Sequence, residues 1–113
     1  MRYAPANRRS EPPVACDFLA MDGAQRERYR ALRLLLCEDL EEVRELDDGY
    51  AFRHSSDPSV VMAVAEYVTL ERLCCPFLDF RIEAGHSGGP TWLSMTGPVG
   101  TKEILAAEIV PGA

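Results

Sequence analysis

Two adjacent cysteines, Cys74 and Cys75, are the residues of this sequence best suited to chemistry. Pro76 follows them directly and cannot continue a helix, so we expect the pair at a helix end, where the backbone changes direction. Two neighbouring thiolates can bind a soft metal ion such as Hg(II), Cu(I) or Zn(II), or a trivalent metalloid such as As(III). They could also close into a vicinal disulfide, or act as a nucleophile and a resolving thiol. In the remaining alternative, one or both cysteines only pack in the core.

The expected position of this pair favours ion binding over catalysis. The C-terminal end of a helix carries a negative partial charge, which does not lower the pKa of a thiol. A bound metal ion, by contrast, supplies its own positive charge and deprotonates the thiols that ligate it. The sequence therefore predicts a thiophilic metal or metalloid site with Cys74 and Cys75 as ligands.

Glu71 is the second notable residue, because it falls within the apolar stripe of the predicted helix, one turn before Cys75. A buried carboxylate must be paired or protonated. One interpretation is a structural ion pair with Arg53, Arg81 or His54. The other is that Glu71 accepts a proton from Cys75, which would make Cys75 a nucleophile, Glu71 its base and the neighbouring cysteine the resolving thiol.

The two other cysteines are weaker candidates. Cys16 precedes the first predicted helix and could fold over the core to supply a third sulfur ligand. Cys37 follows three consecutive leucines and is predicted to pack in the core. The cysteine spacing contains no CxxC pair and matches no zinc-finger pattern. The predicted metal ligands are therefore Cys74 and Cys75, with Cys16 as the possible third.

The elements that must position these residues can be located from caps, breakers and periodicity. Asp22 is a candidate N-cap, and Tyr29, Leu32 and Leu36 recur at helical spacing behind it. The step from Asp57 to proline begins a second helix. The predicted elements are helices over 23–40 and 59–75, a hairpin over 43–54, strands over 77–83 and 91–96, and a helix that begins after 97–98.

This order predicts an α+β fold of the type α-β-β-α-β-β-α, with a four-stranded antiparallel sheet and the helices mainly on one face. Gly49 is expected to take the left-handed conformation in the first hairpin. One sheet face would stay uncovered, which suggests a homodimer or, as a further alternative, an interaction module. The aromatic residues considered for such a contact are Tyr3, Phe77 and Trp92.

Length and composition indicate one domain of 113 residues, with a flexible N-terminal arm over residues 1–15 and the domain over 16–113. No apolar run reaches the roughly 18 residues of a membrane span, and the N-terminus lacks a secretory signal. We therefore expect a cytoplasmic protein without a membrane partner, in which structural disulfides are a poor explanation for the cysteines. The net charge of −6 argues against nucleic acid as a partner.

The segment Glu71–Phe77, which reads ERLCCPF, resembles the E-R-x-C-C-P-F signature of a group of small bacterial proteins. Residues 48–53 and 92–98 also resemble that group, as does Ala15-Cys16-Asp17-Phe18 apart from phenylalanine in place of leucine, so the likeness covers about residues 15–108. Such proteins are loosely associated with heavy-metal and metalloid resistance. The resemblance implies that Cys16, Glu71, Cys74 and Cys75 form one recurring set.

Overall fold

The helices begin and end where the sequence chemistry favours it. Asp22 and Gln25 form a capping box, in which the Asp22 carboxylate accepts from the Gln25 N–H at 2.8 Å and the Gln25 side chain accepts from the Asp22 N–H at 2.9 Å. Asp57 caps the next helix by accepting from the Ser59 N–H, and a proline occupies its first turn. Pro76 lies just beyond the end of that helix.

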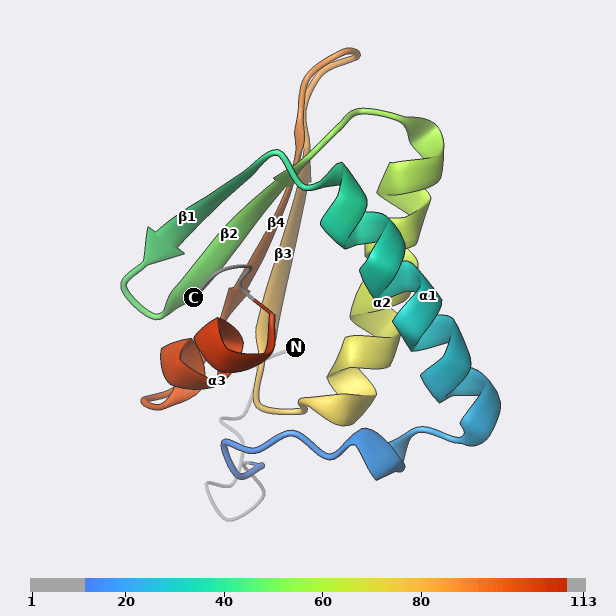
Figure 1. The fold of residues 1–113 in the computed structure, drawn as a ribbon. Coiled ribbons are helices and arrows are strands. Elements are labelled where there is room, and N and C mark those ends of the chain that lie inside the picture. Colours follow the sequence, from blue (N-terminus) through green and yellow to red (C-terminus); the bar gives the residue numbers. More distant parts are fainter. Residues whose placement is uncertain (1–11, 110–113) are drawn as a thin grey trace, which may run out of the picture.

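The computed structural model describes residues 12–109, which form three α-helices and one four-stranded antiparallel sheet (Figure 1). The predicted order α-β-β-α-β-β-α is confirmed. A short 3-10 turn, η2, precedes the first helix. The elements are η2 (Phe18–Ala20), α1 (Gly23–Asp39), β1 (Glu42–Leu46), β2 (Gly49–His54), α2 (Pro58–Cys74), β3 (Asp79–Ala84), β4 (Thr91–Thr96) and α3 (Thr101–Glu108).

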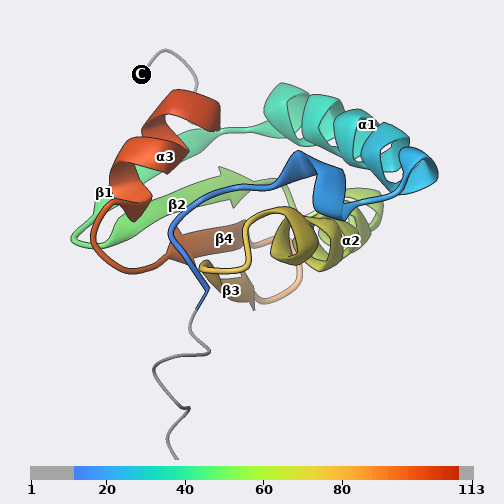
Figure 2. The same cartoon turned by 90° about the horizontal axis from the view of Figure 1, so that it is seen from below.

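The strands lie in the order β1-β2-β4-β3, and the helices lie on one side of the sheet (Figure 2). The stripe predicted on α1, Tyr29, Leu32 and Leu36, is buried. It packs with α2 and with the inner sheet face, where Phe52 and Leu93 are buried as neighbours across β2 and β4. The core between helices and sheet therefore holds the C-terminal end of α2 in a fixed place.

One strand begins later than predicted. The expected strand over 77–83 is observed as Asp79–Ala84. Phe77 and Leu78 lie instead in a turn, in which the Leu78 N–H donates to the Cys75 carbonyl at 3.2 Å. Both side chains are buried in the core, so Phe77, which was considered for a contact through the open sheet face, is not available there.

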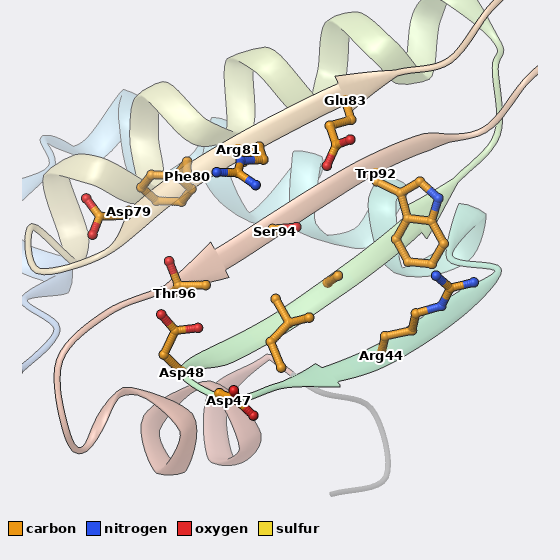
Figure 3. Close-up of a pocket in the computed structure, with 12 residues that line it drawn as sticks. Arg44, Asp47, Asp48, Asp79, Phe80, Arg81, Glu83, Trp92, Ser94 and Thr96 are labelled. Carbon is orange, nitrogen blue, oxygen red and sulfur yellow. The ribbon is translucent and has the colours of Figure 1, made fainter.

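The outer face of the sheet carries a shallow groove of about 700 Å³ (Figure 3). Trp92 lies on this face, with the Arg44 guanidinium carbon 4.4 Å from the centre of an indole ring. Small side chains, Ala51 and Ser94, form part of the floor. The homodimer and the interaction module stay predictions, and Tyr3 lies outside the described residues.

Most of the predicted arm, residues 1–15, lies outside the described part of the chain. Of the arm residues that the structure describes, Val14 packs against the core. Among residues 12–109, no helix combines the length and the apolar character needed to cross a lipid bilayer.

Gly49 is required for a different reason from the predicted one. Among the described residues, only Gly88 and Gly100 have positive φ, so the expected left-handed conformation of Gly49 is wrong. A Cβ atom added to Gly49 would lie 1.9 Å from the carbonyl oxygen of Met95 on β4. The close approach of β2 to β4 therefore excludes a side chain at this position.

Replacing Gly49 by alanine is expected to lower the free energy of unfolding by about 2–3 kcal/mol, because the β2–β4 backbone must shift to admit the methyl group. Urea denaturation followed by circular dichroism measures this change. Gly23→Ala is the matched control, since a Cβ there meets only the end of Arg26 at an ordinary 3.8 Å. Equal stability of the two variants would contradict the conclusion that the β2–β4 contact excludes a side chain at Gly49.

Candidate thiol site

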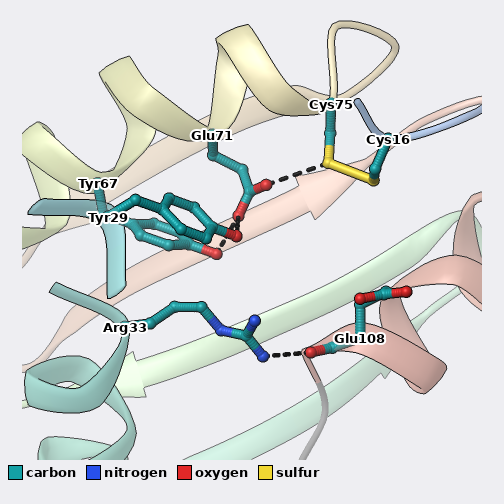
Figure 4. The surroundings of a disulfide bond; sticks show 7 residues. All are labelled: Cys16, Tyr29, Arg33, Tyr67, Glu71, Cys75 and Glu108. Carbon is teal, nitrogen blue, oxygen red and sulfur yellow. Dashed lines mark hydrogen bonds between the residues drawn. A yellow bond between two sulfur atoms is a disulfide. The ribbon is translucent and has the colours of Figure 1, made fainter. Parts of the chain in front are cut away.

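Three cysteine sulfurs meet at the C-terminal end of α2. The Sγ atoms of Cys16, Cys74 and Cys75 all lie within 4.8 Å of one another. Cys16 and Cys75 are joined as a disulfide with their Cα atoms 4.4 Å apart (Figure 4). Cys74 is a buried free thiol. The structure thus brings Cys16 to the vicinal pair, although 59 residues separate it from Cys75 in the sequence.

The disulfide corrects two expectations from the sequence. Structural disulfides were expected to be a poor explanation for these cysteines, yet the structure contains one. The disulfide considered was the vicinal bond between Cys74 and Cys75, whereas Cys75 is bonded to Cys16. As the C-cap of α2, Cys75 leaves the helical direction, and its sulfur lies beside the incoming N-terminal segment.

The segment that carries Cys16 is fixed by backbone and aromatic contacts. The Asp17 N–H donates to the Cys74 carbonyl at 2.6 Å, which satisfies one of the free carbonyls at the end of α2. The Asp17 carboxylate accepts from the Leu19 N–H at 3.1 Å and so begins η2. The Phe18 ring then packs edge-on against Tyr29, with 5.9 Å between the ring centres. Cys16 is therefore placed by the residues that follow it, independently of its own disulfide.

Glu71 is fully buried next to these sulfurs. Its Oε2 accepts hydrogen bonds from the Tyr29 hydroxyl at 2.9 Å and from the Tyr67 hydroxyl. Its Oε1 lies 3.1 Å from the Cys75 sulfur (Figure 4). The carboxylate thus connects two buried phenols to a cysteine sulfur.

The predicted ion pair of Glu71 with Arg53, Arg81 or His54 is wrong. Arg53 contacts Glu41 and Glu42 at the exposed edge of the sheet. His54 lies 3.2 Å from an Asp39 carboxylate oxygen at the end of α1. Arg81 is exposed on β3, on the outer face of the sheet.

Burial governs the proton equilibria of the site. It raises the pKa of Glu71, against the opposing effect of the two tyrosine hydrogen bonds and of Arg33. Burial and the nearby Glu71 carboxylate also raise the pKa of Tyr29 and of Tyr67. The pKa of the Cys74 thiol is raised as well, mainly by burial and then by Glu71. Without a bound cation, Cys74 is therefore a protonated thiol and a poor nucleophile at neutral pH.

The contact between Glu71 and Cys75 depends on the oxidation state. A reduced Cys75 can donate its S–H to Oε1, but a disulfide sulfur has no proton to donate. Among residues 12–109, Oε1 has no other hydrogen-bond partner. The disulfide state therefore favours a protonated Glu71, whose hydroxyl can point at the sulfur, and the reduced state allows a proton to be shared.

A cavity of about 240 Å³ opens beside the three sulfurs. Tyr29, Arg33, Glu71 and Glu108 contribute polar groups to its lining, and Arg33 donates to the Glu108 backbone carbonyl. The apolar part of the lining comes from η2, the turn after α2, and α3 with the residue that follows it. Its members are Phe18, Phe77, Leu78, Ile104, Leu105 and Ile109.

The two tyrosines that bond to Glu71 were not identified from the sequence, and the environment predicted for Cys37 was wrong. Tyr67 lies one helical turn before Glu71, so its role could have been found from the spacing. Tyr29 was assigned only to the core stripe, and nothing local links it to Glu71. Cys37 is exposed on α1, so the prediction that it packs in the core is wrong.

The chain was compared with family models, curated proteins and solved structures, and none of them matches it. Function must therefore be inferred from the chemistry of the site.

Proposed function

We propose that the protein binds one thiophilic metal or metalloid ion through Cys16, Cys74 and Cys75 in their reduced state. The observation that carries this proposal is the position of three sulfurs within 4.8 Å of one another. Metal–sulfur bonds of about 2.3 Å require ligand sulfurs about 4 Å apart, so only small movements are needed. Thiolate ligands select soft ions such as Hg(II), Cu(I) and Zn(II), and the same donors suit As(III).

Glu71 has a role in this proposal as a proton acceptor and positioning residue. Ligation requires that each thiol lose its proton. The Cys75 sulfur lies 3.1 Å from Glu71 Oε1, so its proton has a buried acceptor without leaving the site. The hydrogen bonds from Tyr29 and Tyr67 hold the carboxylate in that orientation.

The oxidation state of the protein should control ion uptake, because the disulfide removes two of the three ligands. We expect one tightly held ion per chain when reduced, desalted protein is titrated with Hg(II), Cu(I), Zn(II) and As(III) under native mass spectrometry. The oxidised protein should hold none tightly. A reducing compartment such as the cytoplasm would keep the site open.

The double variant Cys74→Ser/Cys75→Ser is the control for nonspecific adducts, and Cys37→Ser is the control for loss of a thiol elsewhere. Uptake by the reduced wild type and by Cys37→Ser, but not by the double variant, would support the site. The same stoichiometry in the double variant, or no uptake by the reduced wild type, would overturn the proposal.

A second candidate function is thiol–disulfide exchange, which the disulfide beside Glu71 favours. Cys75 would be the nucleophile and Glu71 its base, with the exposed Cys16, in place of Cys74, as the resolving thiol. Reduction would release Cys75 as a thiolate, which takes the proton of Glu71. In the titration above, a reduced protein that binds no ion but re-forms its disulfide with oxidised glutathione would favour this candidate.

A further inference from the structure

The cavity beside the sulfurs has no part in holding a bare ion. Three thiolates alone complete the coordination of inorganic As(III), yet the site opens into about 240 Å³ of space. Phe18, Phe77 and Ile104 are among the apolar residues that line this space. Apolar lining residues next to a soft-ion site fit an organic group carried by the ion.

We propose that the substrate of this site is a monoorganyl arsenic(III) species, whose arsenic is held by two thiolates and whose organic group packs against the apolar residues that line the cavity. This proposal rests on the proposed function. The chelating pair is Cys16 and Cys75, because sulfurs close enough to bond in the oxidised protein can hold one arsenic atom in the reduced protein. Inorganic As(III) has no organic substituent and takes Cys74 as its third ligand.

The binding step balances without an electron transfer. A species R–As(OH)₂ loses two As–O bonds and gains two As–S bonds, and arsenic stays in the +3 state. Each thiol proton leaves with a hydroxide as water, and Glu71 relays the proton of Cys75. The starting state is the reduced protein, produced from the disulfide by a low-molecular-weight thiol that is itself oxidised to its disulfide.

The first test compares two probes, phenylarsine oxide and arsenite, on variants of the reduced full-length protein. Cys74→Ser should weaken arsenite binding about tenfold or more, with no comparable loss for phenylarsine oxide. Ile104→Trp, which fills the cavity, should do the reverse and weaken only phenylarsine oxide, by about tenfold. Ile82→Trp is the matched control, since Ile82 is partly exposed on β3 and does not line the cavity.

A second measurement keeps the test valid if Ile104→Trp does not fold. The affinity ratio of phenylarsine oxide to methylarsine oxide is measured for the wild type and for a small dithiol that has no cavity. We expect a ratio about tenfold higher for the protein, because only the protein buries the ring. An equal ratio in the protein and the small dithiol would overturn the organyl proposal while the ion site stands. An equal loss of affinity for phenylarsine oxide and arsenite in Ile104→Trp would do the same. Failure of the reduced wild type to bind either probe would overturn both proposals.

Discussion

Cys75→Ser is expected to weaken the binding of a thiophilic ion by the reduced protein by at least about 100-fold. The Cys75 sulfur is the one that contacts both other functional groups, the Cys16 sulfur and the Glu71 carboxylate. A serine hydroxyl is a hard donor that stays protonated at neutral pH, so it neither ligates a soft ion nor uses Glu71 as a proton acceptor. Competition titration of Hg(II) or As(III) against a chromophoric dithiol chelator measures the loss.

Two single variants make this result specific. Cys37→Ser removes an exposed thiol of α1 that does not belong to the cluster of three cysteines. This variant should bind the ion like the wild type. Cys16→Ser removes a ligand and also the disulfide, so its affinity should fall without any remaining dependence on oxidation. Wild-type affinity in Cys75→Ser would show that the ion is held somewhere else in the chain.

The fold could be predicted because most of its signals are local. The capping box at Asp22, the proline after Asp57 and the proline after Cys75 each act within one turn of the residues they affect. The alternating strands then allow little besides an antiparallel sheet. Gly49 shows the limit of the same approach. Its turn context predicted a positive φ, whereas the residue must be glycine because the Met95 carbonyl on another hairpin leaves no room for a side chain.

The site could be predicted only in part, because half of it is assembled by long-range contacts. Helical periodicity was enough to bury Glu71 one turn from Cys75. Its bond to Tyr29 spans 42 positions, and no local pattern indicates which polar group on another helix satisfies a buried carboxylate. From the sequence, arginines and a histidine were the candidate partners of Glu71. The packing of α1 on α2 places tyrosine hydroxyls next to its carboxylate instead.

The prediction that Cys37 packs in the core was wrong for a related reason. A leucine run indicates a buried helix without showing which face is buried. The observed face of α1 passes through Leu32 and Leu36, and Cys37 is turned about 100° from the latter, toward solvent.

Glu71→Ala is expected to lower the free energy of unfolding by about 4 kcal/mol. The variant leaves the buried hydroxyls of Tyr29 and Tyr67 without their acceptor, at about 1–3 kcal/mol each, and adds a cavity. Urea denaturation of the reduced proteins measures this loss. Glu66→Ala is the matched control on the same helix, since Glu66 forms only an exposed pair with Arg28 and its loss should change stability little. Equal effects of the two substitutions would contradict the network.

Glu71→Gln separates the charge of this residue from its shape. Burial raises the pKa of Glu71 in the folded protein above its ordinary value of 4.5, so the folded state binds this proton more tightly than the unfolded state. The resulting stabilisation is fully present below about pH 4.5 and is lost as the pH rises through the folded pKa. The wild type should therefore lose stability relative to Glu71→Gln across that range, when both reduced proteins are unfolded in urea from pH 4 upward. Parallel pH profiles would mean that the folded pKa of Glu71 is not raised above its ordinary value. The buried carboxylate would then be too weak a base to take the proton of Cys75, and that role would have to be abandoned.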